Sequence, residues 1–338
     1  GATPVSALGY RPSMGNRTAQ GPQAEAVHHT RSGVAVTAVS WIVGLLLTLL
    51  VLFTPWAVVA VQSRTAHLVL QTADACIALL VAYLLWGRYV RATRLSDLLL
   101  VQSFLLLAVA DLGVATGSAR VLDEVGAPVG PWIAMALRLL GAVLLALAVL
   151  PASTAVPSRR ATWIAKAAPW TIALLLSTAL WLVRDILPSA VDISPPPVGV
   201  QVTPVPGHPL LAAGHLATAC LMLSASVGFT ARAIQNRDEL ARWLGPAFAL
   251  GAFARVNYAI NPTIYTDWLY AGDVLRTAFH AVLLVGALRE VGQYWSRLAA
   301  HAVLEDRRRL AREIHDGVLQ ELTFIRSVVH DLPEGPAT

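Results

Sequence analysis

Charged residues are scarce in this sequence: Asp, Glu, Lys and Arg make up only 13% of its 338 residues. A typical soluble domain contains about 25%. Hydrophobic residues account for 56% and gather in runs of about twenty, which is enough for a helix to cross a bilayer. The composition argues against a soluble protein and predicts an all-α membrane protein.

Cysteine is almost absent as well. The two cysteines, Cys76 and Cys220, both lie inside apolar runs, so we expect neither a disulfide nor a metal site. The net charge of +5 is not concentrated in one soluble segment, and we therefore expect no direct contact with nucleic acid. No internal repeat is apparent, so an inverted-repeat transporter has no direct support.

Residues 1–33 are rich in Pro, Gly, Ser, Gln and Ala without an apolar period, which predicts a disordered tail. The apolar runs after it predict a polytopic bundle of about eight transmembrane helices within a domain at 34–292. The predicted spans lie near 34–56, 66–87, 95–116, 131–150, 163–184, 209–231, 243–262 and 268–290.

The arginines and the lysine predict the orientation of the chain. Nineteen of them fall on the tail, on alternate loops and on the C-terminal segment, whereas the opposite side carries only Arg64, Arg120 and Arg184. Cytoplasmic loops carry the excess of positive charge. Both termini are therefore expected in the cytoplasm, which requires an even number of spans.

Six charged residues fall inside the predicted spans, all on the outer side of the midplane. They are Asp74, Asp111, Arg138, Arg255, Asp273 and Arg276. A charge that faces lipid costs about 2.5–3.5 kcal/mol on insertion scales. The equal numbers of Asp and Arg favour ion pairs that hold the bundle together, which is the cheapest way to bury charge. A polar cavity that receives a small extracellular ligand is the alternative.

The last span continues without proline from Trp268 to about Val329, which predicts one long helix that leaves the membrane. Apolar residues three or four positions apart form one face of its distal part. They are Ala311, Ile314, Val318, Leu322, Ile325 and Val329. Such a face needs a partner helix to bury it.

His315 lies at the edge of this apolar face and is followed by Asp316. A neutral imidazole is a competent nucleophile near pH 7 when its second nitrogen carries a proton. A neighbouring carboxylate can accept that proton's hydrogen bond and strengthen the nucleophile. The dipeptide alone is a weak signal, because a solvated His-Asp pair is common on helix surfaces.

The longer stretch LAREIHDGVLQEL resembles the phosphoacceptor box of sensor histidine kinases of the NarL/DesK-like subfamily, approximately R-E-[LI]-H-D-x-x-x-Q. The matching residues are Arg312, Glu313, Ile314, His315, Asp316 and Gln320. The resemblance implies that His315 accepts the γ-phosphoryl group of ATP and that Asp316 acts as the base. It further implies that Gln320 aligns a water for dephosphorylation of the response regulator, with Arg312 and Glu313 in support.

The resemblance also implies a homodimer, a response regulator as partner, and the inner (plasma) membrane of a bacterium with its lipid as surroundings. In that architecture 34–292 is the sensor domain, 293–331 is the signalling helix with the first dimerisation and phosphotransfer helix, and 332–338 is a truncated tail. ATP and Mg²⁺ are the implied cofactors. No nucleotide-binding motif follows His315 in this sequence, so we expect the chain by itself to be inactive.

Two other functions stay open at this point. A transporter or channel with a cytoplasmic oligomerisation helix would explain the charges inside the spans and would leave the His-Asp-Gln pattern as coincidence. A membrane scaffold without chemistry has no feature in its favour. The sequence does not specify the stimulus or the cognate response regulator.

Overall fold

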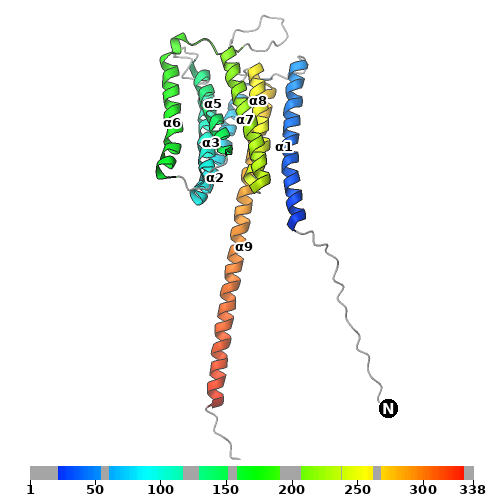
Figure 1. The fold of residues 1–338 in the computed structure, drawn as a ribbon, viewed down its shortest axis with the longest axis vertical. Helices are drawn as coiled ribbons and strands as arrows, with labels where there is room; N and C mark the ends of the chain where they lie inside the picture. Colours follow the sequence, from blue (N-terminus) through cyan, green and yellow to red (C-terminus); the bar gives the residue numbers. More distant parts are fainter. Residues whose placement is uncertain are drawn as a thin grey trace, which may run out of the picture.

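The computed structural model describes residues 22–54, 61–116, 129–150, 158–190, 207–236, 238–261 and 268–330. They form a helical bundle from which one long helix projects (Figure 1). The helices are α1 (Pro22–Phe53), α2 (Arg64–Ala92), α3 (Leu95–Thr116), α5 (Val129–Val149), α6 (Arg159–Leu182), α7 (Pro209–Asn236), α8 (Glu239–Ile260) and α9 (Ala271–His330), with a short 3₁₀ helix, η3 (Arg184–Ile186), after α6. The predicted all-α polytopic bundle is thereby confirmed.

Seven of the described helices are long and apolar enough to cross a membrane, so the chain is a multipass membrane protein. The remaining predicted span, 243–262, coincides with α8. Sixteen of the 22 residues of α8 are buried, because α1, α7 and α9 surround this helix. A helix shielded in this way can contain Arg255 and still lie inside the bundle.

Two boundaries differ from the sequence-based prediction. Helix α1 begins at Pro22 rather than near residue 34, and no proline interrupts it before Pro55. The start of the last predicted span, Trp268–Leu269, forms a two-residue strand, β2, which pairs antiparallel with β1 (Val61–Gln62). This pair joins the segments that lead into α2 and α9. The prediction of a disordered tail at 1–33 is wrong for residues 22–33, which belong to α1, whereas residues 1–21 and the predicted tail at 332–338 lie outside the described residues.

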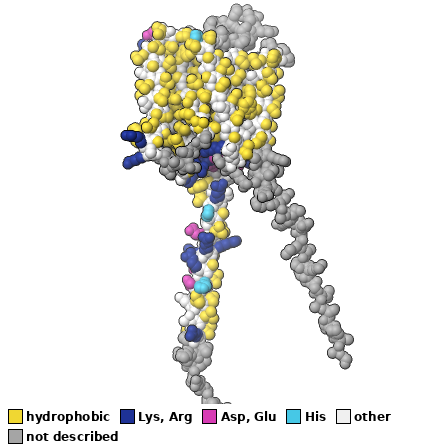
Figure 2. Space-filling view, in the orientation of Figure 1, with side chains coloured by type: hydrophobic (Ala, Val, Ile, Leu, Met, Phe, Trp, Pro, Cys, Tyr) yellow, Lys and Arg dark blue, Asp and Glu magenta, His cyan; other side chains and the backbone are white. Residues whose placement is uncertain are grey.

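The surface of the bundle matches a membrane environment. Figure 2 shows hydrophobic side chains over nearly all of its outer face, with Lys and Arg gathered where α9 leaves the bundle. We call this end of the bundle the exit end. Inside, the rings of Phe104, Phe229 and Phe279 surround Phe248, with centroids 5.6–6.2 Å from its ring. Aromatic contacts of this kind pack the centre of the bundle.

Helix α9 is continuous over 60 residues, as the sequence predicts (Figure 1). Its first part packs against α8 and α2. Every side chain from Tyr294 to Arg326 is exposed. The projecting part of α9 therefore presents all its faces in a single copy of the chain.

Candidate functional site

His315 stands on the exposed part of α9 with its ring accessible from outside. Its side chain is 71% exposed, and that of Asp316 is 75% exposed. The Nδ1 atom of His315 lies 3.4 Å from the Oδ1 atom of Asp316. When Nδ1 carries the proton and its N–H group donates a hydrogen bond to this carboxylate, Nε2 keeps its lone pair and points away from the acid. The arrangement leaves one ring nitrogen free to act as a nucleophile.

The residues around His315 form a charged surface. Arg309 donates a hydrogen bond to Glu313 at 2.9 Å, and Arg312 donates to the backbone carbonyl of Arg308 at 3.2 Å. The spacing of Arg308, Arg312 and His315 by four and three residues places them on one helical face. Positive charge along this face would attract an anionic phosphate group. Gln320 is exposed one turn beyond Asp316, on the side of that carboxylate.

The apolar face predicted beside His315 is exposed. Ile314, Val318, Leu322 and Ile325 are each 50–62% exposed. The side chain of Val329 lies outside the part of the chain whose side chains are described. Because these residues share one face, burial requires a second helix that runs alongside.

The six predicted intramembrane charges are all buried, with at most 4% of each residue exposed. Arg276 of α9 is the centre of one group. Its Nε atom lies 2.9 Å from Oδ2 of Asp74 in α2, and its Nη2 atom lies 3.8 Å from Oδ1 of Asp273. His280, one turn further along α9, places Nδ1 3.2 Å from Oδ1 of Asp74. Asp74 thus contacts two residues of α9. Of these, only Arg276 was among the predicted intramembrane charges.

Asp273 also organises the beginning of α9. It accepts a hydrogen bond from the hydroxyl of Tyr258 in α8 at 2.7 Å and another from the backbone N–H of Tyr270 at 3.0 Å. An acid at the third helical position that bonds back to the residue before the helix is one half of a capping box. Asp273 therefore both caps α9 and connects it to α8.

The other predicted charges are Asp111, Arg138 and Arg255. Arg138 of α5 donates a hydrogen bond to Asp111 of α3 at 2.8 Å. The guanidinium of Arg255 lies over the ring of Tyr258, 5.6 Å from its centroid. A small pocket at the start of α9 is lined by Val51, Asn257, Asn261, Tyr270, Ala271 and Gly272, and by none of the six charges. Five of the six charges thus form ion pairs, as the ion-pair interpretation predicts, whereas Arg255 contacts an aromatic ring.

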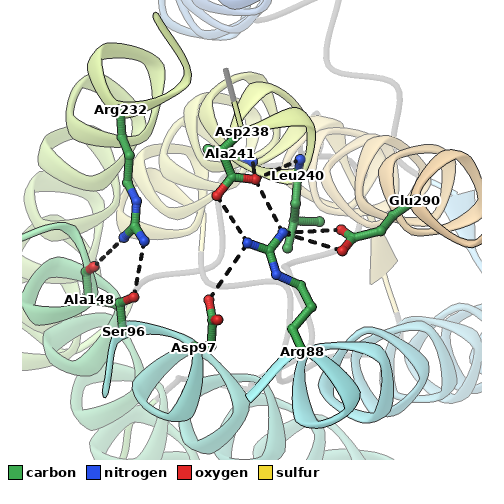
Figure 3. A network of polar contacts seen from close by, with 9 residues as sticks. All are labelled: Arg88, Ser96, Asp97, Ala148, Arg232, Asp238, Leu240, Ala241 and Glu290. Carbon is green, nitrogen blue, oxygen red and sulfur yellow. Dashed lines mark hydrogen bonds and ion pairs between the residues drawn. The ribbon is translucent and has the colours of Figure 1, made fainter. Parts of the chain in front are cut away.

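A further cluster of charge lies at the exit end and was not predicted from the sequence. Figure 3 shows Arg88 of α2 at its centre, surrounded by Asp97 of α3, Asp238 at the N-terminus of α8 and Glu290 of α9. We call these four residues the exit cluster. In the sequence Arg88 is one of the nineteen positive charges that predict the orientation, and nothing there shows which carboxylates approach it.

Within the exit cluster the best contacts join Arg88 to Asp238. The two guanidinium nitrogens lie 3.1 and 3.0 Å from the two carboxylate oxygens, a bidentate pair. Burial would raise the pKa of Asp238, but the hydrogen bond and charge of Arg88 outweigh burial and lower this pKa below its ordinary value. Asp238 also accepts hydrogen bonds from the N–H groups of Leu240 and Ala241, as an N-cap residue does.

The His315 motif and the buried ion pairs are far apart on the same helix. From Arg276 to His315 the helix spans 39 residues, or about 58 Å at 1.5 Å per residue. Among the described residues, no group of three or more His, Cys, Asp or Glu side chains is placed to hold a metal ion. Comparison with known protein families, with curated proteins and with solved structures finds no match.

Proposed function

We propose that this protein is the membrane sensor part of a two-component histidine kinase, in which His315 is phosphorylated and passes the phosphoryl group to an aspartate of a response regulator. The observation that carries the proposal is the exposed ring of His315 with Nδ1 directed at Asp316, 3.4 Å away. A ring enclosed by the bundle would exclude both a kinase domain and a regulator. His315 is instead accessible on a helix that continues directly from the membrane bundle.

The chemistry assigns separate roles to the two ring nitrogens of His315. ATP with Mg²⁺, held by a nucleotide-binding domain, would supply the γ-phosphoryl group. The Nε2 lone pair forms the new N–P bond while the P–O bond to the ADP leaving group breaks. Asp316 holds the proton on Nδ1 and stabilises the positive charge that develops on the ring. Arg308 and Arg312 lie along the approach of the anionic group.

We further propose that the exposed apolar face of α9 is covered by a second copy of the chain. Ile314, Val318 and Leu322 are 50–62% exposed and lie beside His315. In a parallel homodimer the two α9 helices would pack along this face and leave His315 at its rim, as two of the helices of a four-helix bundle. The basic exit end then faces the cytoplasm of a bacterium, where the response regulator is found.

Phosphorylation of the full-length gene product tests the proposal. We expect incubation with γ-labelled ATP to label the protein, and the substitution His315→Gln to abolish the label. His301→Gln is the matched control, because His301 is exposed on the same helix two heptads earlier and should not affect labelling. Label retained by His315→Gln would refute the assignment. Solute flux into proteoliposomes together with an absence of label would support a transporter instead.

A further inference from the structure

Helices α2 and α9 run in the same direction and are joined at three levels. At the end opposite the exit, strand β1 before α2 pairs with strand β2 before α9. Asp74 then pairs with Arg276, and Arg88 pairs with Glu290 at the exit end. Both helices advance by 14 residues between the two ion pairs, which is two heptads, or about 21 Å. The two helices therefore stay in register along the whole bundle.

Among the described residues, the pair of Arg88 with Glu290 is the last ion pair that joins α9 to another helix before α9 projects. It is followed by a cation–π contact, in which the guanidinium of Arg91 in α2 lies 5.1 Å from the ring centroid of Tyr294. Beyond Tyr294 the side chains are exposed up to Arg326. At this end of the bundle Arg88 and Arg91 thus connect α9 to α2, while Arg289 lies over the ring of Trp243 in α8, 5.0 Å from its centroid.

Arg88 donates hydrogen bonds to Asp238 and Glu290, and it holds Glu290 less tightly than Asp238. Both oxygens of Glu290 lie 3.3 Å from a single nitrogen, Nη1, which also donates to Asp238. Its side chain is 27% exposed, compared with 14% for Asp238 and 3% for Asp97. The cluster sets three carboxylates against one central guanidinium, so the acids repel one another. Of the two acids that accept hydrogen bonds from Arg88, Glu290 is therefore the one that is released more easily.

The position of Glu290 along α9 relates it to His315. The two residues are 25 apart, which is about seven turns of helix, so they lie on nearly the same face about 37 Å from one another. No proline interrupts α9 between them. A rotation of the helix at Glu290 is therefore carried to His315 by a continuous, hydrogen-bonded rod.

We propose that the exit cluster is a latch that holds α9 at one rotational setting relative to α2, and that release of Glu290 from Arg88 lets α9 turn and reorients His315. The mechanical part of this inference stands on the contacts of Arg88 alone. Its regulatory part rests on the proposed function of His315. Asp238 and Asp97 keep Arg88 in place when Glu290 leaves, so the latch can close again.

Distance measurement by pulsed electron paramagnetic resonance tests the mechanical part. Spin labels are attached at Ala92→Cys on α2 and Ala300→Cys on α9, both exposed, with Cys76 and Cys220 replaced by serine and labelled chains diluted with unlabelled ones. Glu290→Gln should raise the population at a second distance about tenfold, the effect of one lost charge-assisted hydrogen bond. Glu305→Gln, an exposed acid further along α9, should leave the distribution unchanged.

An unchanged distribution in Glu290→Gln would overturn the latch. The substitution retains the bidentate pair of Arg88 with Asp238, so the exit end should remain folded; the elution volume in detergent checks this. The rate at which γ-labelled ATP phosphorylates His315 in the full-length protein tests the regulatory part. A changed rate in Glu290→Gln but not in Glu305→Gln supports regulation, whereas equal rates overturn it. If the native full-length protein incorporates no phosphate from ATP, the proposed function is refuted. The distances between the spin labels still test whether the exit cluster acts as a latch.

Discussion

The guanidinium of Arg276 lies 2.9 Å from the carboxylate of Asp74, and both residues are 1% exposed. The pair joins α9, the helix that leaves the bundle, to α2 at a depth where neither charge reaches water. Asp74 also lies 3.2 Å from His280, one turn along α9. A change in how α2 packs would therefore act directly on α9.

Substitution of Arg276 by glutamine should destabilise the bundle by about 3–5 kcal/mol, because it leaves Asp74 buried without its arginine partner and removes the positive charge beside Asp273. Denaturation of the protein in detergent micelles measures this loss. Arg326→Gln, which removes an exposed arginine from the same helix, should change stability by less than about 0.5 kcal/mol. The double variant Asp74→Asn with Arg276→Gln should recover part of the loss. Equal stability of Arg276→Gln and the native protein would contradict the ion-pair interpretation.

Gly286→Ala should loosen the contact between α9 and α8. A Cβ atom at Gly286 would lie 2.6 Å from the Cβ atom of Trp243, which is closer than two carbons can approach. Overpacking of this kind costs about 1–3 kcal/mol, and the midpoint of thermal unfolding measures it. The control is Gly292→Ala on the same helix, where nothing lies within 4 Å of the added atom. That change should stabilise α9 by up to about 1 kcal/mol, since Ala favours helix over Gly.

The stabilisation that Asp238 contributes to the folded protein should be lost only as the pH falls. Its pKa is lowered in the folded protein, so the stabilisation is present above the ordinary pKa of a free aspartate and is lost as the pH falls through the folded value. The difference in unfolding free energy between native protein and Asp238→Asn should therefore be constant from about pH 5 to pH 8, at about 1.5–3 kcal/mol, and shrink below about pH 4.

Asparagine is also an effective N-cap, so Asp238→Asn retains the cap of α8 and isolates the charge. Asp306→Asn on the exposed part of α9 serves as the reference, with little effect on stability at any of these pH values. A difference for Asp238→Asn that grows toward acid pH would show that the Arg88 pair does not hold this carboxylate ionised.

Hydropathy and helical period predicted much of the architecture. Runs of apolar residues identified the positions of the helices, and the absence of proline after Trp268 predicted the unbroken α9. The apolar span of α1, Gly33–Phe53, agrees with the predicted 34–56, but the helix itself begins 12 residues before residue 34, because a polar helical segment before a membrane span has no distinctive apolar period.

The sequence by itself determined that acids and arginines inside the spans would be buried, since their cost in lipid leaves no other solution. It also determined that His315 and Asp316 adjoin on one long helix. Only the tertiary structure decided that Asp74 contacts Arg276 and His280, and that Arg88 gathers carboxylates from three other helices. Partners of this kind depend on which helices are neighbours and on how each is rotated, and neither quantity is contained in the local period of any one segment.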